Sequence, residues 1–351
     1  MRRLLHVIRA LEPGGIELWL VDLLRAHALP GWQMEFLVET SHPGVLEAAV
    51  TRHGATIHRW RGPAGLPFSA ESLRRLLRDR GPFAAVHSHV HAFSGVVLSA
   101  AQQAGVPLRI AHSHCQQEEH TPWRRFYRQA MQRLIAASAT LRLAVSGAAA
   151  ANLFGDGAPA SIIPAARDLR GYGQPLDREA SRAALGCAKG DLVVAHVGRL
   201  TPEKNQQLLL ALAARNPRLR VLIAGEGPLR HELRHPRVHL LGDVRDLRPL
   251  FTAADCFAFP SVSEGLGLAL VEAQAAGLPC VISDAIPREA IIIPELVDRV
   301  ALQQELPVWM TAIERAAQRD RLPDSWQRAI TTPYHVQRSG ELLEAAYAHA
   351  G

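Results

Sequence analysis

The sequence predicts an α/β protein built from two Rossmann-like domains, each a doubly wound parallel sheet with helices on both faces. Three observations lead to this prediction. The chain has 351 residues, and typical domains contain roughly 100–200 residues. Short apolar runs alternate with segments of helical period along its length, a pattern typical of parallel sheets. The alternation stops over residues 155–190, which are rich in Gly, Pro and Asp, and then starts again.

The first half opens with an apolar strand, a glycine turn and a helix. Residues 4–8 (LLHVI) precede Pro13-Gly14-Gly15, and a helical pattern begins at Glu17, which indicates strand, turn and helix. The same alternation then predicts strand 34–39, helix 68–80 capped by Ser69, strand 83–88, helix 93–104, strand 108–112, helix 121–138 and strand 141–145.

The second half repeats this organisation after the connection at 155–190. The pattern predicts strand 192–197, a helix after Pro202, strand 219–224, a helix after Pro228, strand 238–241, helix 246–253, strand 255–259, helix 268–276 and strand 279–283. We therefore assign residues 1–165 to the first domain and residues 166–335 to the second. A helix near 338–350 lies in the C-terminal segment 336–351.

Composition excludes several classes of protein. The four cysteines are far apart and form neither a disulfide framework nor a zinc-ribbon pattern. The N-terminal apolar stretch is interrupted by His6, Arg9 and Glu12, which makes it too polar for a signal peptide. No run approaches the ~18 apolar residues that a transmembrane helix needs. We expect a cytoplasmic protein.

The net charge lies in the first half of the chain. Residues 1–165 contain 17 arginines, no lysine and 11 acidic residues, which accounts for the whole net charge of +6. Such an excess suggests a surface that faces an anionic partner. Residues 123–133 mix aromatic side chains with arginines, as helices at a membrane surface do; the alternative is an ordinary surface helix with its aromatics in the core. No nucleic-acid motif is present, so we expect no nucleic-acid partner.

The strongest chemical motif is the pair Glu264 and Glu272, which flanks a glycine turn at the start of a predicted helix. Ligands of open α/β sheets bind beyond the carboxyl ends of the strands, so we expect the site in the crevice between the two domains. Gly265 and Gly267 allow a ligand to approach the backbone, and the free N–H groups at the helix start suit a phosphate. Glu272, more than one turn inside the helix, can accept hydrogen bonds from ribose hydroxyls.

Two further glycine turns carry charge or precede a helix. Gly198 follows a strand, and Arg199 and Lys204 then place two cations near the next helix start. Such a pair can neutralise a diphosphate leaving group without a metal ion. The glycines at 14 and 15 can bring the first domain's backbone up to the same diphosphate.

Histidines gather at the ends of two predicted strands. Imidazole groups suit zinc, but no H-x-x-x-H helix and no close acidic partner supports a metal site. We therefore expect no bound metal, with one or two of these histidines in the crevice and the others simply polar. The residues concerned are His87, His89, His91, His112, His114 and Cys115.

Taken together, these motifs resemble the retaining glycosyltransferases of family 4, which have the two-domain GT-B architecture. The resemblance covers almost the whole chain. The opening HVIRALEPGGIE and the RIAHSH segment are similar to bacterial enzymes that build capsule, exopolysaccharide or lipopolysaccharide. The motifs that carry the resemblance are Gly-Gly-x-Glu at 14–17, His-x-His at 87–89, the Gly-Arg element at 198–205, Ala-Gly-Glu-Gly-Pro at 224–228, and the E-x7-E pair followed by Ala-Ala-Gly-Leu-Pro at 275–279.

The resemblance implies a role for each matching residue. Glu272 would hold the ribose, and Glu264 would lie against the donor sugar. Arg199 and Lys204 would bind the diphosphate and stabilise its departing charge, and His114 would hydrogen-bond the transferred sugar. The family retains the anomeric configuration and is thought to use front-face attack, so no protein nucleophile is assigned. The donor-binding set also includes Gly15, Gly198, Gly265, Leu266 and Gly267.

The activity implied is transfer of a sugar from a UDP- or GDP-sugar to a lipid-linked glycan or polysaccharide at the inner face of the cytoplasmic membrane. The first domain would bind the acceptor, the second would bind the nucleotide-sugar, and segment 336–351 would return to the first domain. No cofactor is expected. The sequence departs from the family after Ile163-Pro164, where Ala165-Ala166-Arg167-Asp168 replaces an Asn-Gly-containing stretch. A non-hydrolysing sugar-nucleotide epimerase and a non-catalytic nucleotide-binding scaffold of glycan assembly remain as alternatives.

Overall fold

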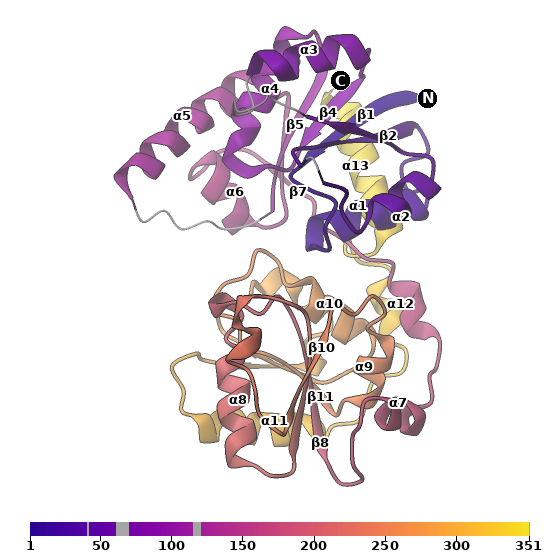
Figure 1. Ribbon diagram of the computed structural model, residues 1–351, viewed down its shortest axis with the longest axis vertical. Helices are drawn as coiled ribbons and strands as arrows, with labels where there is room; N and C mark the ends of the chain where they lie inside the picture. Colours follow the sequence, from indigo (N-terminus) through magenta and orange to yellow (C-terminus); the bar gives the residue numbers. More distant parts are fainter. Residues whose placement is uncertain (41, 61–69, 115–120, 351) are drawn as a thin grey trace. The chain divides into compact units, whose positions relative to one another are not determined.

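The computed structural model describes residues 1–40, 42–60, 70–114 and 121–350, and it divides into two compact units (Figure 1). Unit 1 comprises Met1–Asp168 and Pro333–Gly351, and unit 2 comprises Leu169–Thr332. These boundaries lie close to the predicted ones at 165–166 and 335–336, but not at them. The predicted class, α/β with two parallel sheets, is confirmed.

Unit 1 is built on a seven-stranded sheet, counted over the described residues, in which all the strands run parallel. The strand order is β3-β2-β1-β4-β5-β6-β7, which extends the order of the doubly wound dinucleotide-binding fold by one edge strand. The strands are β1 (Arg2–Ile8), β2 (Trp32–Val38), β3 (Thr56–Arg59), β4 (Ala85–Ser88), β5 (Leu108–Ser113), β6 (Leu141–Ala144) and β7 (Ser161–Ile162).

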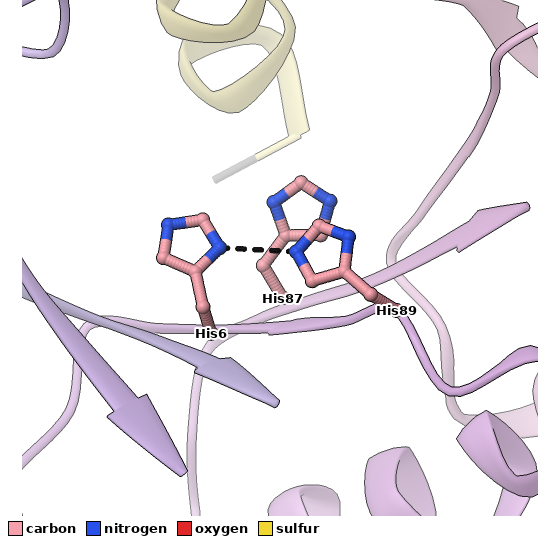
Figure 2. Close-up of side chains that lie close together, drawn as sticks. All are labelled: His6, His87 and His89. Atoms are coloured by element: carbon pink, nitrogen blue, oxygen red, sulfur yellow. Dashed lines mark hydrogen bonds between the residues drawn. The ribbon is translucent and has the colours of Figure 1, made fainter. Parts of the chain in front are cut away.

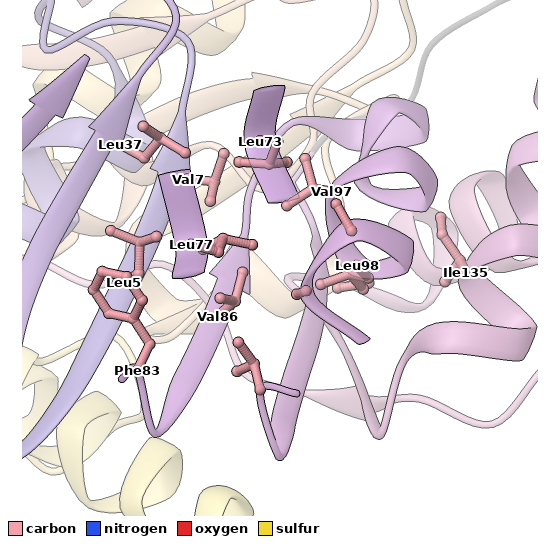
Figure 3. Close-up of a cluster of buried hydrophobic side chains, with 14 of the residues drawn as sticks. Leu5, Val7, Leu37, Leu73, Leu77, Phe83, Val86, Val97, Leu98 and Ile135 are labelled. Atoms are coloured by element: carbon pink, nitrogen blue, oxygen red, sulfur yellow. The ribbon is translucent and has the colours of Figure 1, made fainter. Parts of the chain in front are cut away.

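One face of the unit 1 sheet packs on an apolar helical layer. Figure 3 shows Leu5 and Val7 of β1 among side chains from these helices. Alternate residues of a strand point to opposite faces, so His6, between Leu5 and Val7, points to the other face of the sheet. The helices on the apolar face are α3 (Ala70–Arg80), α4 (Ser94–Gln103), α5 (Pro122–Ser138) and α6 (Gly147–Phe154).

The opposite face of this sheet is covered by α1 (Gly15–Arg25) and by the C-terminal helix α13 (Val336–Ala350), while α2 (Glu47–Arg52) contacts α1. The Trp19 indole donates a hydrogen bond to Ser339 Oγ at 3.0 Å, which joins the two helices. A Cβ added to Gly340 would lie 2.2 Å from the carbonyl oxygen of Ala28. Only glycine allows α13 to approach the end of α1 this closely. The C-terminal helix is thus an integral part of unit 1.

Unit 2 contains a six-stranded parallel sheet among the described residues, in the order β10-β9-β8-β11-β12-β13. Its strands are β8 (Leu192–Val197), β9 (Leu219–Ala224), β10 (Val238–Gly242), β11 (Cys256–Phe259), β12 (Cys280–Ser283) and β13 (Val297–Val300). Its helices are α7 (Arg178–Ala184), α8 (Gln206–Arg215), α9 (Arg248–Ala253), α10 (Leu268–Ala275), α11 (Leu306–Ala317) and α12 (Ser325–Ala329).

Both faces of the unit 2 sheet are buried against helices. Val194 of β8 packs into the core under α8 and α11, whereas its neighbour Val193 packs into the core with α9 and α10. A strand that is apolar on both faces is characteristic of a covered parallel sheet. This explains why the central strands of unit 2 are mostly apolar on both faces, as in CFAF of β11 and CVIS of β12.

Several predicted elements differ from the structure. The helix expected after Pro228 is a single 3-10 turn, Pro228–His231, because β10 follows after a short connection. The segment 155–190, predicted to be a connection, contains β7 and helix α7, and α7 packs against α9. Strands β3, β7 and β13 were not predicted. Ser69, the expected cap of helix 68–80, lies outside the described residues.

Candidate functional site

Two of the predicted charged residues of unit 2, one from each of its two motifs, form an ion pair. Lys204 Nζ lies 2.6 Å from Glu264 Oε1, although the two residues are 60 positions apart in sequence. Lys204 ends a 3-10 turn, Pro202–Lys204, beyond β8, and Glu264 precedes α10. The exposed fraction of the Glu264 side chain is 8% and that of Lys204 is 21%. The carboxylate is therefore held in place at the protein's surface rather than freely solvated.

Helix α10 begins just after this carboxylate. Its N-cap, Gly267, has a φ of +91°, a left-handed conformation that favours glycine. No side chain among the described residues caps this end, and the first turn contains no acidic residue. The first N–H groups of the helix thus lie at its positive end, available to an anion. Farther along the helix, Glu272 is 8% exposed, and its Oε1 accepts a hydrogen bond from the Tyr172 hydroxyl at 3.0 Å.

Two buried polar residues hold the turn that carries Arg199 through hydrogen bonds. His196 Nδ1 lies 2.9 Å from the Ala258 carbonyl, which can only accept, so Nδ1 carries the proton. Gln206 Nε2 then donates to His196 Nε2 at 3.3 Å and to the Arg199 carbonyl at 2.8 Å. Burial lowers the pKa of His196 to about 4, so the ring is neutral. The sequence did not indicate that His196 and Gln206 support this turn. Arg199 itself is exposed.

The glycines at 225 and 227 have a packing role. A Cβ on Gly225, whose φ is +141°, would lie 2.1 Å from the Gly198 carbonyl oxygen. A Cβ on Gly227 would lie 2.4 Å from the carbonyl oxygen of Leu200. The turn after β9 therefore packs directly on the backbone of the turn after β8, and the glycines of residues 224–228 set the position of the Gly198-Arg199 turn.

In unit 1, the predicted glycine turn lies at the start of α1. Gly14 is the N-cap and Gly15 is the first helical residue; no side chain among the described residues caps this end either. Gly15 is exposed. Trp19, one turn farther along, is completely buried and places its indole against His89, His112 and His114.

Five imidazoles converge on the face of the unit 1 sheet that α1 and α13 cover. This histidine cluster consists of His6 from β1, His87 and His89 from β4 and the following turn, and His112 and His114 from β5 and the residue after it. The period-2 alternation puts each of them on this one face. Sequence reasoning missed His6, whose alignment with His87 in neighbouring strands was hidden inside the apolar run LLHVI. His91 instead contacts Asn152, and Cys115 lies outside the described residues.

The histidine cluster is held by two rows of hydrogen bonds. One row joins His6 Nδ1 to His89 Nε2 at 3.0 Å and His89 Nδ1 to His114 Nε2 at 2.8 Å. The other row joins the Tyr347 hydroxyl to His87 Nδ1 at 2.8 Å, His87 Nε2 to His112 Nδ1 at 3.1 Å, and His112 Nε2 to the carbonyl of Ile163 at 3.0 Å. Within the described residues, His6 Nε2 and His114 Nδ1 are buried without a partner.

All five imidazoles are neutral at ordinary pH. Burial lowers the pKa of His6 and of His112 to about 3. Burial, together with neighbouring histidines, holds the pKa of His87, His89 and His114 well below the usual value. No carboxylate opposes these shifts. Each ring therefore carries one N–H and one lone pair.

The basic aromatic segment predicted at 123–133 forms the first part of α5. Its aromatic side chains are not in the core: Trp123 is 73% exposed, Phe126 61% and Tyr127 37%. The Trp123 and Phe126 rings stack at 5.9 Å between centroids. The alternative that placed these aromatics in the core is therefore wrong, and the predicted membrane contact stays a prediction. Across the described residues, no helix is both long and apolar enough to span a bilayer.

Comparison with known proteins identifies the family to which this chain belongs. Residues 14–165 match the model of the glycosyl transferase 4-like domain, and residues 177–307 match that of glycosyl transferases group 1. EpsF of Bacillus subtilis, a protein named as a glycosyltransferase, is 33% identical over 344 residues, covering 90% of this chain and 88% of its own. The chain belongs to the family 4-type glycosyltransferases.

Other proteins are similar over part of the chain or in fold. The D-inositol 3-phosphate glycosyltransferase of Mycobacterium bovis is 42% identical over 124 residues, which cover 31% of this chain and 26% of that protein. The structure of HepE from Anabaena in complex with UDP and glucose superposes with a TM-score of 0.79 at 19% identity, covering 99% of this chain and 100% of HepE. At this identity the likeness shows the fold, and the fold is that of GT-B glycosyltransferases.

Proposed function

We propose that this glycosyltransferase transfers a sugar from a nucleoside diphosphate sugar, with retention of the anomeric configuration, to a lipid-linked glycan or polysaccharide. The observation that carries the proposal is the Lys204–Glu264 pair at the start of α10. It places a cation and a carboxylate beside free helix N–H groups. Such a combination suits a diphosphate and the sugar attached to it.

Different residues of unit 2 bind the diphosphate, the sugar and the ribose of the donor. Lys204, Arg199 and the N-terminus of α10 bind the diphosphate and stabilise its charge as it leaves, without a metal ion. Glu264 lies against the donor sugar, next to the backbone of Gly265, Leu266 and Gly267. Glu272, oriented by the Tyr172 hydroxyl, accepts hydrogen bonds from the ribose. Structures of HepE hold UDP and UDP-glucose, which makes a UDP-sugar the first donor to test and a GDP-sugar the second.

Unit 1 is the proposed acceptor domain. There Gly15 contacts the phosphates and His114 hydrogen-bonds the transferred sugar. His114 Nε2 is tied to His89, which fixes the orientation of its ring. No side chain is assigned as a nucleophile, so retention follows from attack by the acceptor on the face from which the diphosphate leaves.

A lipid-linked acceptor requires access to a membrane surface, and α5 supplies a suitable one. The exposed rings of Trp123 and Phe126 lie on the same helix as Arg125 and Arg128. Aromatic side chains enter the interfacial region while arginines meet lipid phosphates. We propose that this part of α5 contacts the anionic inner face of the cytoplasmic membrane.

Donor binding is tested by thermal shift with UDP, GDP, ADP and CDP, each with and without EDTA. A ligand at about 100 times its Kd adds roughly 2.7 kcal/mol to the free energy of unfolding, which raises Tm by a few degrees. We expect one diphosphate to raise Tm by the same amount with and without EDTA. If none of the four raises Tm, the chain does not bind a nucleotide-sugar in this way.

Transfer is tested by product analysis with the donor alone and with a lipid-linked acceptor. An epimerase converts the donor without an acceptor, a scaffold leaves it unchanged in both cases, and a transferase consumes it when the acceptor is present. Glu264→Ala should reduce transfer, whereas Glu179→Gln, an exposed acidic residue of the same unit, should not. Undiminished transfer by Glu264→Ala contradicts the assigned role.

Membrane contact is tested by sedimentation with vesicles of phosphatidylglycerol and phosphatidylcholine. The double substitution Trp123→Ser and Phe126→Ser should lower the bound fraction several-fold. Val308→Ser is the matched control, because Val308 is an exposed apolar residue (44%) on a helix of unit 2. Equal binding by the wild type and the α5 variant would mean that α5 is an ordinary surface helix.

A further inference from the structure

The hydrogen bonds of the histidine cluster fix the proton positions on two of its rings. The carbonyl of Ile163 can only accept, so the proton of neutral His112 is on Nε2 and its Nδ1 carries a lone pair. His87 must then donate from Nε2 to His112 Nδ1. The lone pair of His87 is consequently on Nδ1, where it accepts from the rotatable hydroxyl of Tyr347.

The same reasoning separates two groups of three histidines. In each group, one nitrogen of every ring lies within 4.8 Å of the others: His6, His87 and His89 in the first, and His89, His112 and His114 in the second. His112 uses both of its nitrogens, one to accept from His87 and one to donate to Ile163. It has no lone pair left for a metal ion. In the first group, the lone pair of His87 Nδ1 is engaged only by a hydroxyl that can turn away.

The remaining two rings of the first group, His6 and His89, face each other through one nitrogen apiece. In the tautomer in which His89 donates from Nδ1 to His114 Nε2, the lone pair of His89 is on Nε2. That atom is 3.0 Å from His6 Nδ1. Two nitrogens bound to one tetrahedral zinc ion at roughly 2.0–2.1 Å are separated by about 3.3 Å. Figure 2 shows the rings of His6, His87 and His89 close together, with the His6–His89 contact dashed.

We propose that His6 Nδ1, His87 Nδ1 and His89 Nε2 form a binding site for a divalent transition-metal ion, with Zn²⁺ as its natural occupant. The Tyr347 hydroxyl, 2.8 Å from His87 Nδ1, supplies the fourth ligand. The site joins β1 and β4 to the C-terminal helix α13. It lies wholly in unit 1 and does not depend on the transfer reaction proposed above.

The surroundings of the three rings are those of metal-ligating histidines. Such a histidine usually donates its second N–H to another group, which fixes the ring and its tautomer. His87 does so to His112, which in turn donates to a carbonyl, and His89 can do so to His114. His6 is the exception, because its Nε2 is buried without a partner among the described residues. A buried nitrogen without a partner costs free energy. Metal ligation at Nδ1 would compensate that cost through the other nitrogen of the ring.

The chemistry of the ligands selects the ion. Three neutral imidazoles and a hydroxyl suit Zn²⁺, Cu²⁺, Ni²⁺ or Co²⁺, whereas Mg²⁺ and Ca²⁺ require carboxylate or carbonyl oxygens. Three histidines with an oxygen as fourth ligand is an established arrangement for zinc.

The test uses the full-length chain without a polyhistidine tag, dialysed against EDTA and then into metal-free buffer. Calorimetric titration with Zn²⁺ should show one site per chain, and Co²⁺ should give the intense visible absorption of a four-coordinate ion. His6→Gln should weaken Zn²⁺ binding at least ~100-fold, since loss of a supporting group alone costs about 10- to 100-fold. His53→Gln, which changes an exposed histidine of the same unit, should leave binding unchanged.

Two results would overturn the proposal: a folded wild-type chain that binds no stoichiometric Zn²⁺, or unchanged affinity in folded His6→Gln. If His6→Gln does not fold, Tyr347→Phe decides, because it removes one oxygen and keeps the ring. It should weaken Zn²⁺ binding about 10-fold or more and change the Co²⁺ spectrum. An unchanged affinity and an unchanged spectrum in Tyr347→Phe would refute the site.

Discussion

The Lys204–Glu264 pair allows a quantitative test of the site's construction. Lys204→Met removes the cation but keeps most of the side chain's length, leaving the Glu264 carboxylate, 8% exposed, without its ion-pair partner. A buried acceptor left without its partner costs about 1–3 kcal/mol. For units of this size, each 1 kcal/mol lowers Tm by roughly 2–4 °C. For a cost of about 2 kcal/mol, the middle of that range, we expect the melting temperature of unit 2 to fall by about 4–8 °C.

A double-mutant cycle separates this effect from loss of packing. Glu264→Gln removes the charge that Lys204→Met leaves unpaired, so the double variant should be more stable than the sum of the two single effects predicts. Residues in direct contact show coupling energies of about 0.5–3 kcal/mol, and we expect at least ~1 kcal/mol here. The measurement is thermal unfolding of the four proteins at one pH and salt concentration. Additivity within ~0.3 kcal/mol would show that the pair does not hold Glu264 in place.

Three further predictions address other parts of the molecule. Gly225→Ala, which places a Cβ 2.1 Å from the Gly198 oxygen at a φ of +141°, should lower the free energy of unfolding by about 2–5 kcal/mol. Gly190→Ala, with a φ of +88° and open space, should cost only about 1–2 kcal/mol; equal losses in denaturant titrations would contradict the packing argument. Glu272→Gln should weaken binding of the nucleoside diphosphate about 10- to 100-fold, as expected for a lost charged hydrogen bond, and Tyr172→Phe by less; calorimetry that ranks them in reverse would show that Glu272 is not the ribose contact. Stability in EDTA should fall as pH drops from 6.5 toward 3, because histidines of the unfolded chain take up protons below their ordinary pKa of 6.5, whereas the folded-state pKa of His6 and of His112 is about 3. Proton uptake by each of these two histidines in the unfolded chain should lower the free energy of unfolding by about 1.4 kcal/mol at pH 5.5. A flat profile of unfolding free energy between pH 7 and pH 5 would show that they are not buried as neutral rings.

The doubly wound architecture could be predicted because its signal is repeated along the chain. Each buried strand of unit 2 is a short apolar run, and each run is followed by a turn rich in glycine or charge. Strand β7, only Ser161–Ile162, escaped prediction because two residues carry no period. The turn at Pro228 was predicted as a helix because its glycine and proline resemble a helix start, yet these glycines serve the close contact with the neighbouring turn.

The charged residues of the candidate site could be found from sequence, but their partners could not. Glu264 and Lys204 were identified from glycine turns on different strands, and only the sheet topology brings them within 2.6 Å. His196, Gln206 and Tyr172 carry no local signal, because each acts through hydrogen bonds that only the folded chain brings together. The roles assigned to the site residues remain predictions for the experiments above.

The position of α13 has a consequence for how the chain is made. Trp19 and Ser339, which meet through a hydrogen bond, are 320 positions apart. Ribosomes add roughly 5–20 residues per second, so synthesis of unit 2, Leu169–Thr332, delays the C-terminal helix by about 8–33 s. Unit 2 is continuous in sequence and has its own core on both sheet faces, and it can fold while unit 1 is still incomplete. During this interval the face that carries the histidine cluster lacks one of its two covering helices, so unit 1 can complete its fold only after the whole of unit 2 has been synthesised.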